Sequence, residues 1–286
     1  MAASSRIKPE SQTRGVQQMI SDSVQALRDE CLALDRLLTA LPTGEWERRT
    51  DFFAWTIRDE VMHLHLVDLF ALQSVESRDQ FLDTARQVRA AQAQGVELSA
   101  QMRTRFGAQS PMAMLSTWRT TWQVLCDRAA VEDPKRRVAW FGPDMSLRSL
   151  VGARQMEVWA HGQDILDVLR VRRMNNDSIY NICDLGVRTF EWSFRNRGES
   201  VQPEAPSVVL TSPSGLEWVW NSGRGESVAG SAEDFAMVVT QRRNVADTQL
   251  RVHGSGAQRW MEIAQCFAGA PESPPAAGVR VVRLSE

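Results

Sequence analysis

The sequence predicts an α plus α+β protein, in which a helical N-terminal domain precedes a small α+β domain. Apolar side chains recur at helical spacing over most of residues 16–198. Residues 199–206 then hold two prolines, as in a linker, and short apolar runs separated by turn residues follow. We therefore expect a helical domain over 16–198 and a small α+β domain over 199–286. Residues 1–15 are polar and are expected to form a loose tail.

Helices follow one another through the N-terminal domain. Apolar residues spaced three and four apart predict a helix over 16–41, which Pro42-Thr43-Gly44 ends. The second helix begins at Thr56, where Asp59 three positions later completes a capping box, and it runs to about residue 73. Further helical segments are expected over 79–106, from Pro111 to Leu125, from Ser146 past Leu169, and from Asp177 to Gly198.

The C-terminal domain is predicted to mix short strands with helices. Residues 208–210 and 216–220 flank the turn Ser212-Pro213-Ser214-Gly215, a pattern typical of a hairpin. Ser231 and Asp234 can cap a helix that carries Phe235. The remaining expected elements are strands over 227–229 and 250–252 and a closing helix over 256–267.

Composition and charge exclude several classes of protein. The 286 residues are 43% hydrophobic and 24% charged, which is ordinary for a globular chain. With 33 basic and 35 acidic residues the net charge is -2, so nucleic acid is not an expected partner. No apolar run approaches the length of a membrane-spanning helix, and no hydrophobic stretch of a signal peptide follows the polar start.

The four cysteines stand far apart in apolar-periodic surroundings. A free cysteine behaves as a small hydrophobic residue, so each is expected to be a reduced, buried thiol. Together with the missing signal peptide, this makes the cytoplasm the expected location. The cysteines are Cys31, Cys126, Cys183 and Cys266.

Histidines on two of the predicted helices suggest a metal site. Glu157 and His161 are four residues apart, so they share one face of a helix and their side chains can converge on one ion. His63 and His65 lie on the second helix, which an antiparallel bundle could place beside this one. Two imidazoles and one carboxylate form a common ligand set for zinc and also suit Fe(II). His253 follows a predicted strand and is expected in a turn or on the surface.

Two segments resemble a known family. From Trp55 to Leu64, a tryptophan precedes the helix, an acid caps it, and His63 stands eight positions after the tryptophan. From Ala153 to Ile165, Glu157 and His161 are followed by a glycine and an aspartate. These patterns resemble the metal-binding segments of the DinB-like four-helix bundles, and in particular the mycothiol-dependent maleylpyruvate isomerases. Residues 228–235 are more weakly similar to that family's small sterol-carrier-like domain.

The resemblance implies a ligand set that periodicity alone leaves open. It assigns His63, Glu157 and His161 to one divalent metal, Zn2+ first, with Fe2+ or Ni2+ as alternatives. Residues two apart on a helix are separated by about 200°, so His63 and His65 cannot both face the ion. The helical wheel favours His65, which lies nearer the apolar face, and the resemblance favours His63. Asp59 and Asp164 are candidates to orient a ligand imidazole.

The resemblance also implies a class of activity. We expect a metal-dependent enzyme that uses a low-molecular-weight thiol as cosubstrate and acts on a small electrophilic molecule as an isomerase or S-transferase. Related enzymes place an arginine of the second domain near the metal pocket, so Arg242 is expected to bind a substrate or thiol carboxylate. The alternatives are hydrolysis through a metal-bound hydroxide, a non-catalytic metal-containing protein that binds a small ligand, and an Fe(II)-dependent oxygenase-like enzyme.

Overall fold

The computed structural model describes residues 9–280, and their side chains from residue 23 onward. The chain divides into two compact units. The first comprises Met1–Leu41 and Val61–Arg154, and the second comprises Pro42–Glu60 and Gln155–Glu286. Helices α2 (Ile57–Glu76) and α6 (Leu147–Leu169) each contribute residues to both units.

The first unit is built from helices. Besides its share of α2 and α6, it contains α1 (Pro9–Thr39), α3 (Arg78–Ala93), α4 (Leu98–Phe106), α5 (Pro111–Val131) and a two-stranded antiparallel ribbon of β1 (Arg137–Val138) and β2 (Met145–Ser146).

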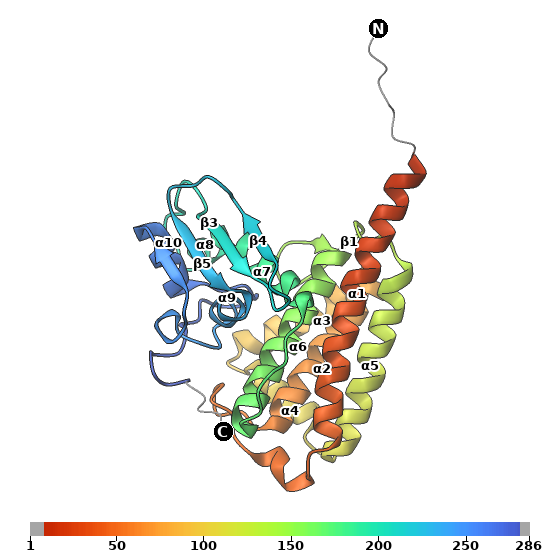
Figure 1. The fold of residues 1–286 in the computed structure, drawn as a ribbon. Helices are drawn as coiled ribbons and strands as arrows, with labels where there is room; N and C mark the ends of the chain where they lie inside the picture. The colour runs from red at the N-terminus through yellow and green to blue at the C-terminus, as the bar shows by residue number, and fades with distance from the viewer. Residues whose placement is uncertain (1–8, 281–286) are drawn as a thin grey trace. The chain divides into compact units, whose positions relative to one another are not determined.

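The helices of this unit contact one another through polar side chains as well as through their apolar faces. Helices α1 and α5 run side by side (Figure 1), and Arg119 of α5 pairs with Asp35 of α1 at 2.8 Å. The buried carboxylate of Asp68 on α2 accepts hydrogen bonds from Trp118 Nε1 at 2.9 Å and from Arg154 Nε at 2.8 Å. Because a buried charge is costly unless it is paired, Asp68 and Arg154 fix the contact between α2 and the first turns of α6.

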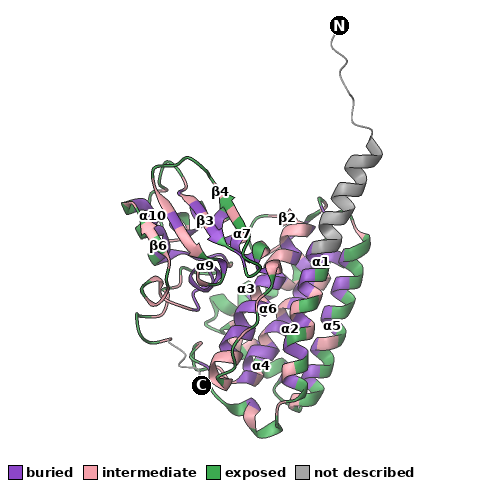
Figure 2. Cartoon of the chain, in the orientation of Figure 1, coloured by how far each residue is buried: buried purple, intermediate pink, exposed green. Residues whose placement is uncertain are grey.

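Helix α5 shows how the sequence determines where a helix begins and which of its faces is buried. Its start was predicted at Pro111, which occupies the first turn, while Ser110 caps the helix by accepting a hydrogen bond from the Ala113 N–H. Its buried residues recur three and four positions apart, including Trp118 and Trp122, and Figure 2 shows the exposed opposite face in green. The prediction for this helix is confirmed.

The second unit surrounds a small mixed sheet. Its elements are the 3-10 turns η1 (Thr43–Glu47), η2 (Asp177–Ile179) and η3 (Val245–Asp247), the helices α7 (Tyr180–Arg188), α8 (Phe190–Arg195), α9 (Ala232–Val239) and α10 (Ser255–Ile263), and the strands β3 (Ser207–Thr211), β4 (Glu217–Trp220), β5 (Ser227–Ser231) and β6 (Arg251–His253).

The four strands lie in the order β4-β3-β5-β6. Strands β3 and β4 form the predicted hairpin, β5 runs parallel to β3, and β6 is antiparallel to β5. Ser231 ends β5 and caps α9 by accepting a hydrogen bond from the Asp234 N–H at 3.0 Å, as predicted. The strands and the helices of this unit can be followed in Figure 1.

Helices α7 to α10 and the sheet share one apolar core. The rings of Phe190 and Phe235 both pack edge-on against Trp260 of α10, with centroid distances of 5.2 and 5.7 Å. Gly186 lets α7 approach α9 closely, since a Cβ atom there would lie 2.8 Å from the Val239 side chain. Trp159 and Ala160 of α6 belong to the same core, which anchors the part of α6 that carries the candidate ligands.

The predicted fold class is confirmed: the described chain is mostly helical, and a small mixed sheet lies in its C-terminal part. Several details differ from the predictions, among them the helical segment expected over 79–106, which is divided into α3 and α4. Helix α1 already begins at Pro9, before the predicted start at residue 16, while residues 1–8 of the expected tail lie outside the described chain. The single helix expected over 177–198 is interrupted at Thr189, whose hydroxyl donates to the Leu185 carbonyl.

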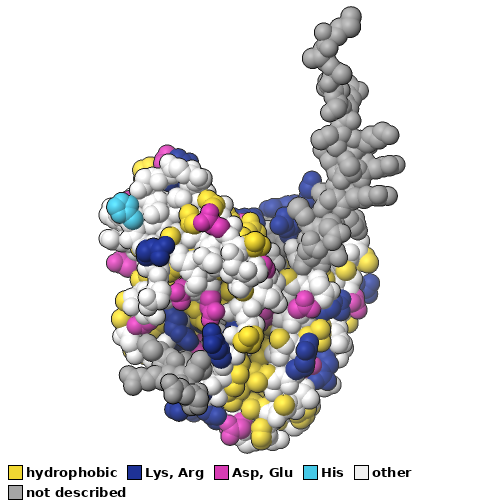
Figure 3. All heavy atoms as spheres, in the orientation of Figure 1, with side chains coloured by type: hydrophobic (Ala, Val, Ile, Leu, Met, Phe, Trp, Pro, Cys, Tyr) yellow, Lys and Arg dark blue, Asp and Glu magenta, His cyan; other side chains and the backbone are white. Residues whose placement is uncertain are grey.

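The surface and the helix lengths agree with the composition. On the face drawn in Figure 3, acidic and basic side chains are interspersed, in keeping with a net charge of -2. Within residues 9–280, none of the helices combines the length and the apolar character needed to span a membrane. The four cysteines are all free and buried, as predicted.

Candidate metal centre

The segment before α2 folds back on itself and fixes where that helix begins. The Thr50 N–H donates to the Trp55 carbonyl at 2.7 Å, and Phe53 and Ala54 between them turn the chain with φ of 50° and 53°. Two consecutive non-glycine residues in the left-handed region carry local strain, which the surrounding hydrogen bonds maintain. The fold-back places Thr50 against the first turn of α2.

The capping box predicted at the start of α2 is confirmed. The Thr56 N–H donates to Asp59 Oδ2 at 3.0 Å, and the Asp59 N–H donates to Thr56 Oγ1 at 3.1 Å. Asp59 thus helps to start the helix that carries Glu60 and His63. Glu60 and His63 are three residues apart and therefore lie on one face of α2.

His161 of α6 is held between two carboxylates, one at each ring nitrogen. Its Nε2 atom lies 3.2 Å from Oε2 of Glu157, one helical turn earlier. Its Nδ1 atom lies 2.7 Å from Oε2 of Glu60. Asp164, which we expected to orient an imidazole, is 4.0 Å from Nδ1, too far for a hydrogen bond. The carboxylate that contacts the imidazole is therefore Glu60.

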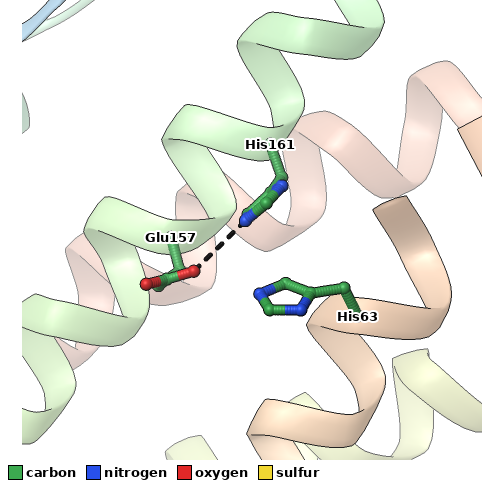
Figure 4. A group of neighbouring side chains, drawn as sticks. All are labelled: His63, Glu157 and His161. Carbon is green, nitrogen blue, oxygen red and sulfur yellow. Dashed lines mark ion pairs between the residues drawn. The ribbon is translucent and has the colours of Figure 1, made fainter. Parts of the chain in front are cut away.

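His63, Glu157 and His161 lie close together in the structure. Each offers one ligand atom, and these atoms lie within 4.8 Å of one another (Figure 4). His161 is buried, whereas His63 and Glu157 are half-buried. Figure 4 shows the three side chains pointing toward one another from α2 and α6. Two imidazoles and a carboxylate at this spacing match the donor set that zinc commonly takes.

His65 lies in a different environment. It is 5% exposed, and its ring packs against that of Phe106 with a centroid distance of 4.8 Å. Burial, together with the positive charge of Arg105, lowers the pKa of His65 to about 4. The helical wheel predicts that His65 points inward, and in the structure this side chain packs in the core of the helical unit.

Glu60 is a candidate functional residue that the sequence alone does not predict. Its side chain is fully buried, and its Oε1 atom accepts a hydrogen bond from Thr50 Oγ1 at 2.7 Å. Burial raises the pKa of the Glu60 carboxyl well above its usual value, and the hydrogen bond from Thr50 opposes this shift. The one signal in the sequence is its position three residues before His63, which places both side chains on the same face of the helix.

Arg242 is buried in a cluster of charged and aromatic groups. Its guanidinium lies 2.7 Å from Asp164 Oδ2 and donates to the carbonyl oxygens of Ala160 and Thr240. Arg280 approaches the other oxygen of Asp164 at 3.5 Å. These contacts satisfy the charge of Arg242 within the protein. Its predicted role in binding a substrate carboxylate stays a prediction.

Aromatic rings enclose the imidazole of His161. The Trp55 ring stacks nearly parallel to it at 6.1 Å, and the Phe52 ring meets it edge-on at 5.1 Å. The guanidinium groups of Arg242 and Arg280 lie over the Phe52 ring at 4.7 and 5.7 Å. Such packing restricts rotation of the imidazole and limits the access of water.

A second group of acidic residues and histidine is less suited to a metal. Glu60, His161 and Asp164 also offer three donor atoms within 4.8 Å of one another. However, Asp164 already pairs with Arg242 and Arg280, and a metal cation here would be repelled by both guanidinium charges. The two guanidinium groups therefore make this second group poorly suited to a metal ion.

The fold and the site together define a helical protein with a candidate metal centre of two histidines and one glutamate. Residues 27–166, which include all three candidate ligands, match the mycothiol maleylpyruvate isomerase N-terminal domain. An uncharacterized protein of Mycobacterium tuberculosis strain CDC 1551 / Oshkosh is 39% identical over 249 residues, covering 87% of this chain and 96% of that protein. An uncharacterized protein of a second strain of this species gives the same values.

Among solved structures, the crystal structure of the mycothiol-dependent maleylpyruvate isomerase is similar, with a TM-score of 0.51 and 15% identity over 78% of this chain and 89% of that chain. At this identity the similarity concerns the fold. The chain belongs to the family of proteins that carry the mycothiol maleylpyruvate isomerase N-terminal domain. The predicted family resemblance is thereby confirmed.

Proposed function

We propose that this protein is a zinc-dependent, thiol-using isomerase or S-transferase that acts on a small electrophilic molecule. The observation that carries the proposal is the convergence of His63, Glu157 and His161, whose ligand atoms lie within 4.8 Å of one another. Three protein ligands are typical of catalytic zinc sites, which keep a further position for water or substrate. Family membership supports the same class of activity.

The residues around the candidate ligands fit a bound zinc ion. The carboxylate of Glu60 lies on the Nδ1 side of His161, which leaves the Nε2 side toward Glu157. When bound, zinc lowers the pKa of a coordinated thiol, so that a thiolate is present at neutral pH. The rings of Phe52 and Trp55 shield the imidazole from water.

The thiol has to come from outside the chain. All four cysteines are buried, and burial raises the pKa of each of their thiols, that of Cys126 to about 12. A thiol that stays protonated and inaccessible is a poor nucleophile. We therefore propose a low-molecular-weight thiol as cosubstrate, and mycothiol first, since the related isomerase is mycothiol-dependent.

The chemistry follows from the reactivity of a thiolate. Its electron pair forms a C–S bond with a double bond conjugated to a carbonyl group, whose oxygen takes up the displaced π electrons as an enolate, so that the former double bond becomes single and can rotate. Return of these electrons expels the thiolate, restores the double bond and completes an isomerisation, whereas transfer of a proton from water to the enolate carbon leaves the thiol attached as a conjugate. Arg242 is proposed to contribute positive charge for a carboxylate of the substrate or thiol. We also propose a cytoplasmic location, which the four free cysteines support.

The experiment that tests this function uses the full-length chain loaded with zinc. Mycothiol is supplied with maleylpyruvate and, separately, with a set of other electrophiles, while thiol loss and substrate isomerisation are followed. We expect turnover that requires both zinc and the thiol and that His161→Ala abolishes. Turnover without any thiol would instead indicate hydrolysis, and no turnover with any combination would contradict the proposed enzyme.

A further inference from the structure

The two ring nitrogens of His161 face different carboxylates, and only one of them can bind a metal. A neutral imidazole carries its proton on one nitrogen and offers a lone pair on the other. The hydrogen bond made by one nitrogen decides which tautomer is present. For Nε2 to act as the ligand atom beside Glu157, the proton has to stay on Nδ1, and Nδ1 then needs an acceptor.

We propose that Glu60 is a positioning residue that keeps the proton of His161 on Nδ1 and so makes Nε2 the metal-binding nitrogen. This inference rests on the proposed function, because it assumes that His161 is a ligand. The distance of 2.7 Å between Glu60 Oε2 and Nδ1 is that of a short hydrogen bond. Asp164 at 4.0 Å cannot take this role.

The carboxylate of Glu60 is itself fixed on both sides. Oε1 accepts a hydrogen bond from Thr50 Oγ1 at 2.7 Å, while Oε2 faces the imidazole. Thr50 is held in turn by the fold-back that joins its N–H to the Trp55 carbonyl. With both oxygens engaged and the side chain fully buried, Glu60 cannot swing toward Nε2 and act as a ligand there.

The same segment also restrains the ring. Trp55, which closes the fold-back, stacks on His161 with an interplanar angle of 11°, and Phe52 packs edge-on at 89°. Thus the strained turn before α2 supplies both the support for Glu60 and the two rings that enclose the imidazole. The function of this turn is to set the orientation of one metal ligand.

Zinc affinity is the first readout that tests this role. Zinc is titrated into the full-length protein against a chromophoric chelator, for the wild type, Glu60→Gln and Asp167→Asn. Removal of a carboxylate that accepts a hydrogen bond from a ligand histidine typically lowers metal affinity about 10–100-fold. We expect a loss of this size for Glu60→Gln. Asp167→Asn is the matched control, since Asp167 lies on α6 but pairs with Arg243 at 2.7 Å, and its affinity should equal that of the wild type.

The tautomer of His161 is the second readout, which a merely structural role would not change. In zinc-loaded, 15N-labelled wild type, we expect a protonated Nδ1 and a metal-shifted Nε2, assigned by their loss in His161→Gln. In Glu60→Gln the Nδ1 proton should exchange faster with water. Thr50→Val keeps Glu60 but removes the hydrogen bond that Thr50 donates to it, so this variant should have an intermediate zinc affinity. Circular dichroism verifies that each variant is folded.

The results distinguish the proposed role of Glu60 from the proposed zinc site itself. If Glu60→Gln binds zinc as tightly as the wild type and its His161 signals are unchanged, this inference is wrong, although the metal site stands. If the wild type itself binds no zinc, the proposed function fails and the inference fails with it.

Discussion

His161 Nε2 lies 3.2 Å from Glu157 Oε2 across one turn of α6, so the two side chains present a nitrogen and an oxygen donor to the same point. Neither residue needs a distant part of the chain for this, because residues four apart on a helix share a face. His63 completes the group from α2 (Figure 4). The local geometry of one helix therefore supplies two of the three proposed ligands.

The two histidines of α2 should differ in their importance for the metal. We expect His63→Ala to abolish zinc binding, because it removes one of three ligands. His65→Leu should retain zinc with a changed melting temperature, because its ring packs against Phe106. Metal content after purification, measured by plasma emission spectrometry, checks both. Zinc lost from the His65 variant and retained by the His63 variant would reverse the assignment.

Arg242→Ala separates substrate binding from packing. If Arg242 holds an anionic substrate or thiol, zinc content should be unchanged while KM rises, since a hydrogen bond to a charged group contributes about 1.5–3 kcal/mol, or about 10–100-fold. The melting temperature should fall as well, because Asp164 loses a partner at 2.7 Å. Steady-state kinetics and thermal unfolding check this, with Arg243→Ala as the control. A lower melting temperature with an unchanged KM would show that Arg242 serves only to pair with Asp164.

Metal removal should lower stability without unfolding the protein. The helices pack through their own apolar faces and through the buried Asp68–Arg154 pair, so the fold does not depend on the ion. A ligand at 100 times its Kd stabilises the folded state by about 2.7 kcal/mol, and chelation should remove a contribution of this order. Circular dichroism with and without chelator measures both effects. A collapse of the helical signal on chelation would contradict a preformed site.

The buried thiols predict how stability depends on pH. Burial raises the pKa of Cys126 from 9.0 to about 12. Above about pH 9 the unfolded chain releases this proton while the folded chain keeps it, so the unfolded state binds fewer protons and the free energy of unfolding falls as pH rises. This contribution is fully present below pH 9 and is lost progressively toward pH 12. Urea unfolding at increasing pH should give a shallower decline for Cys126→Ala, and identical slopes would show that this thiol does not titrate differently in the two states.

Local sequence rules predicted where several of the helices begin. The capping box of Thr56 and Asp59, Pro111 in a first turn and the cap at Ser231 are all confirmed, because each depends only on residues three positions apart. The shared face of Glu157 and His161 is of the same kind. The interruption at Thr189 was not predicted, since a threonine within an otherwise helical run gives a weak signal.

Contacts between distant residues could not be predicted in this way. Glu60 and His161 are 101 positions apart, and Glu60 follows an aspartate in a polar first turn that looks exposed. Its burial depends on the turn at Phe53 and Ala54, a conformation that neither residue favours. Periodicity also favoured His65 over His63, because a helical wheel identifies the apolar core and not the wall of a polar site.

X-ray diffraction at the zinc absorption edge, from crystals of the zinc-loaded protein, tests the proposed ligand set directly. We expect one anomalous peak within about 2.0–2.2 Å of a nitrogen of His63, an oxygen of Glu157 and Nε2 of His161. A peak among Glu60, His161 and Asp164, a peak at His65, or no peak near α2 and α6 would contradict this ligand set.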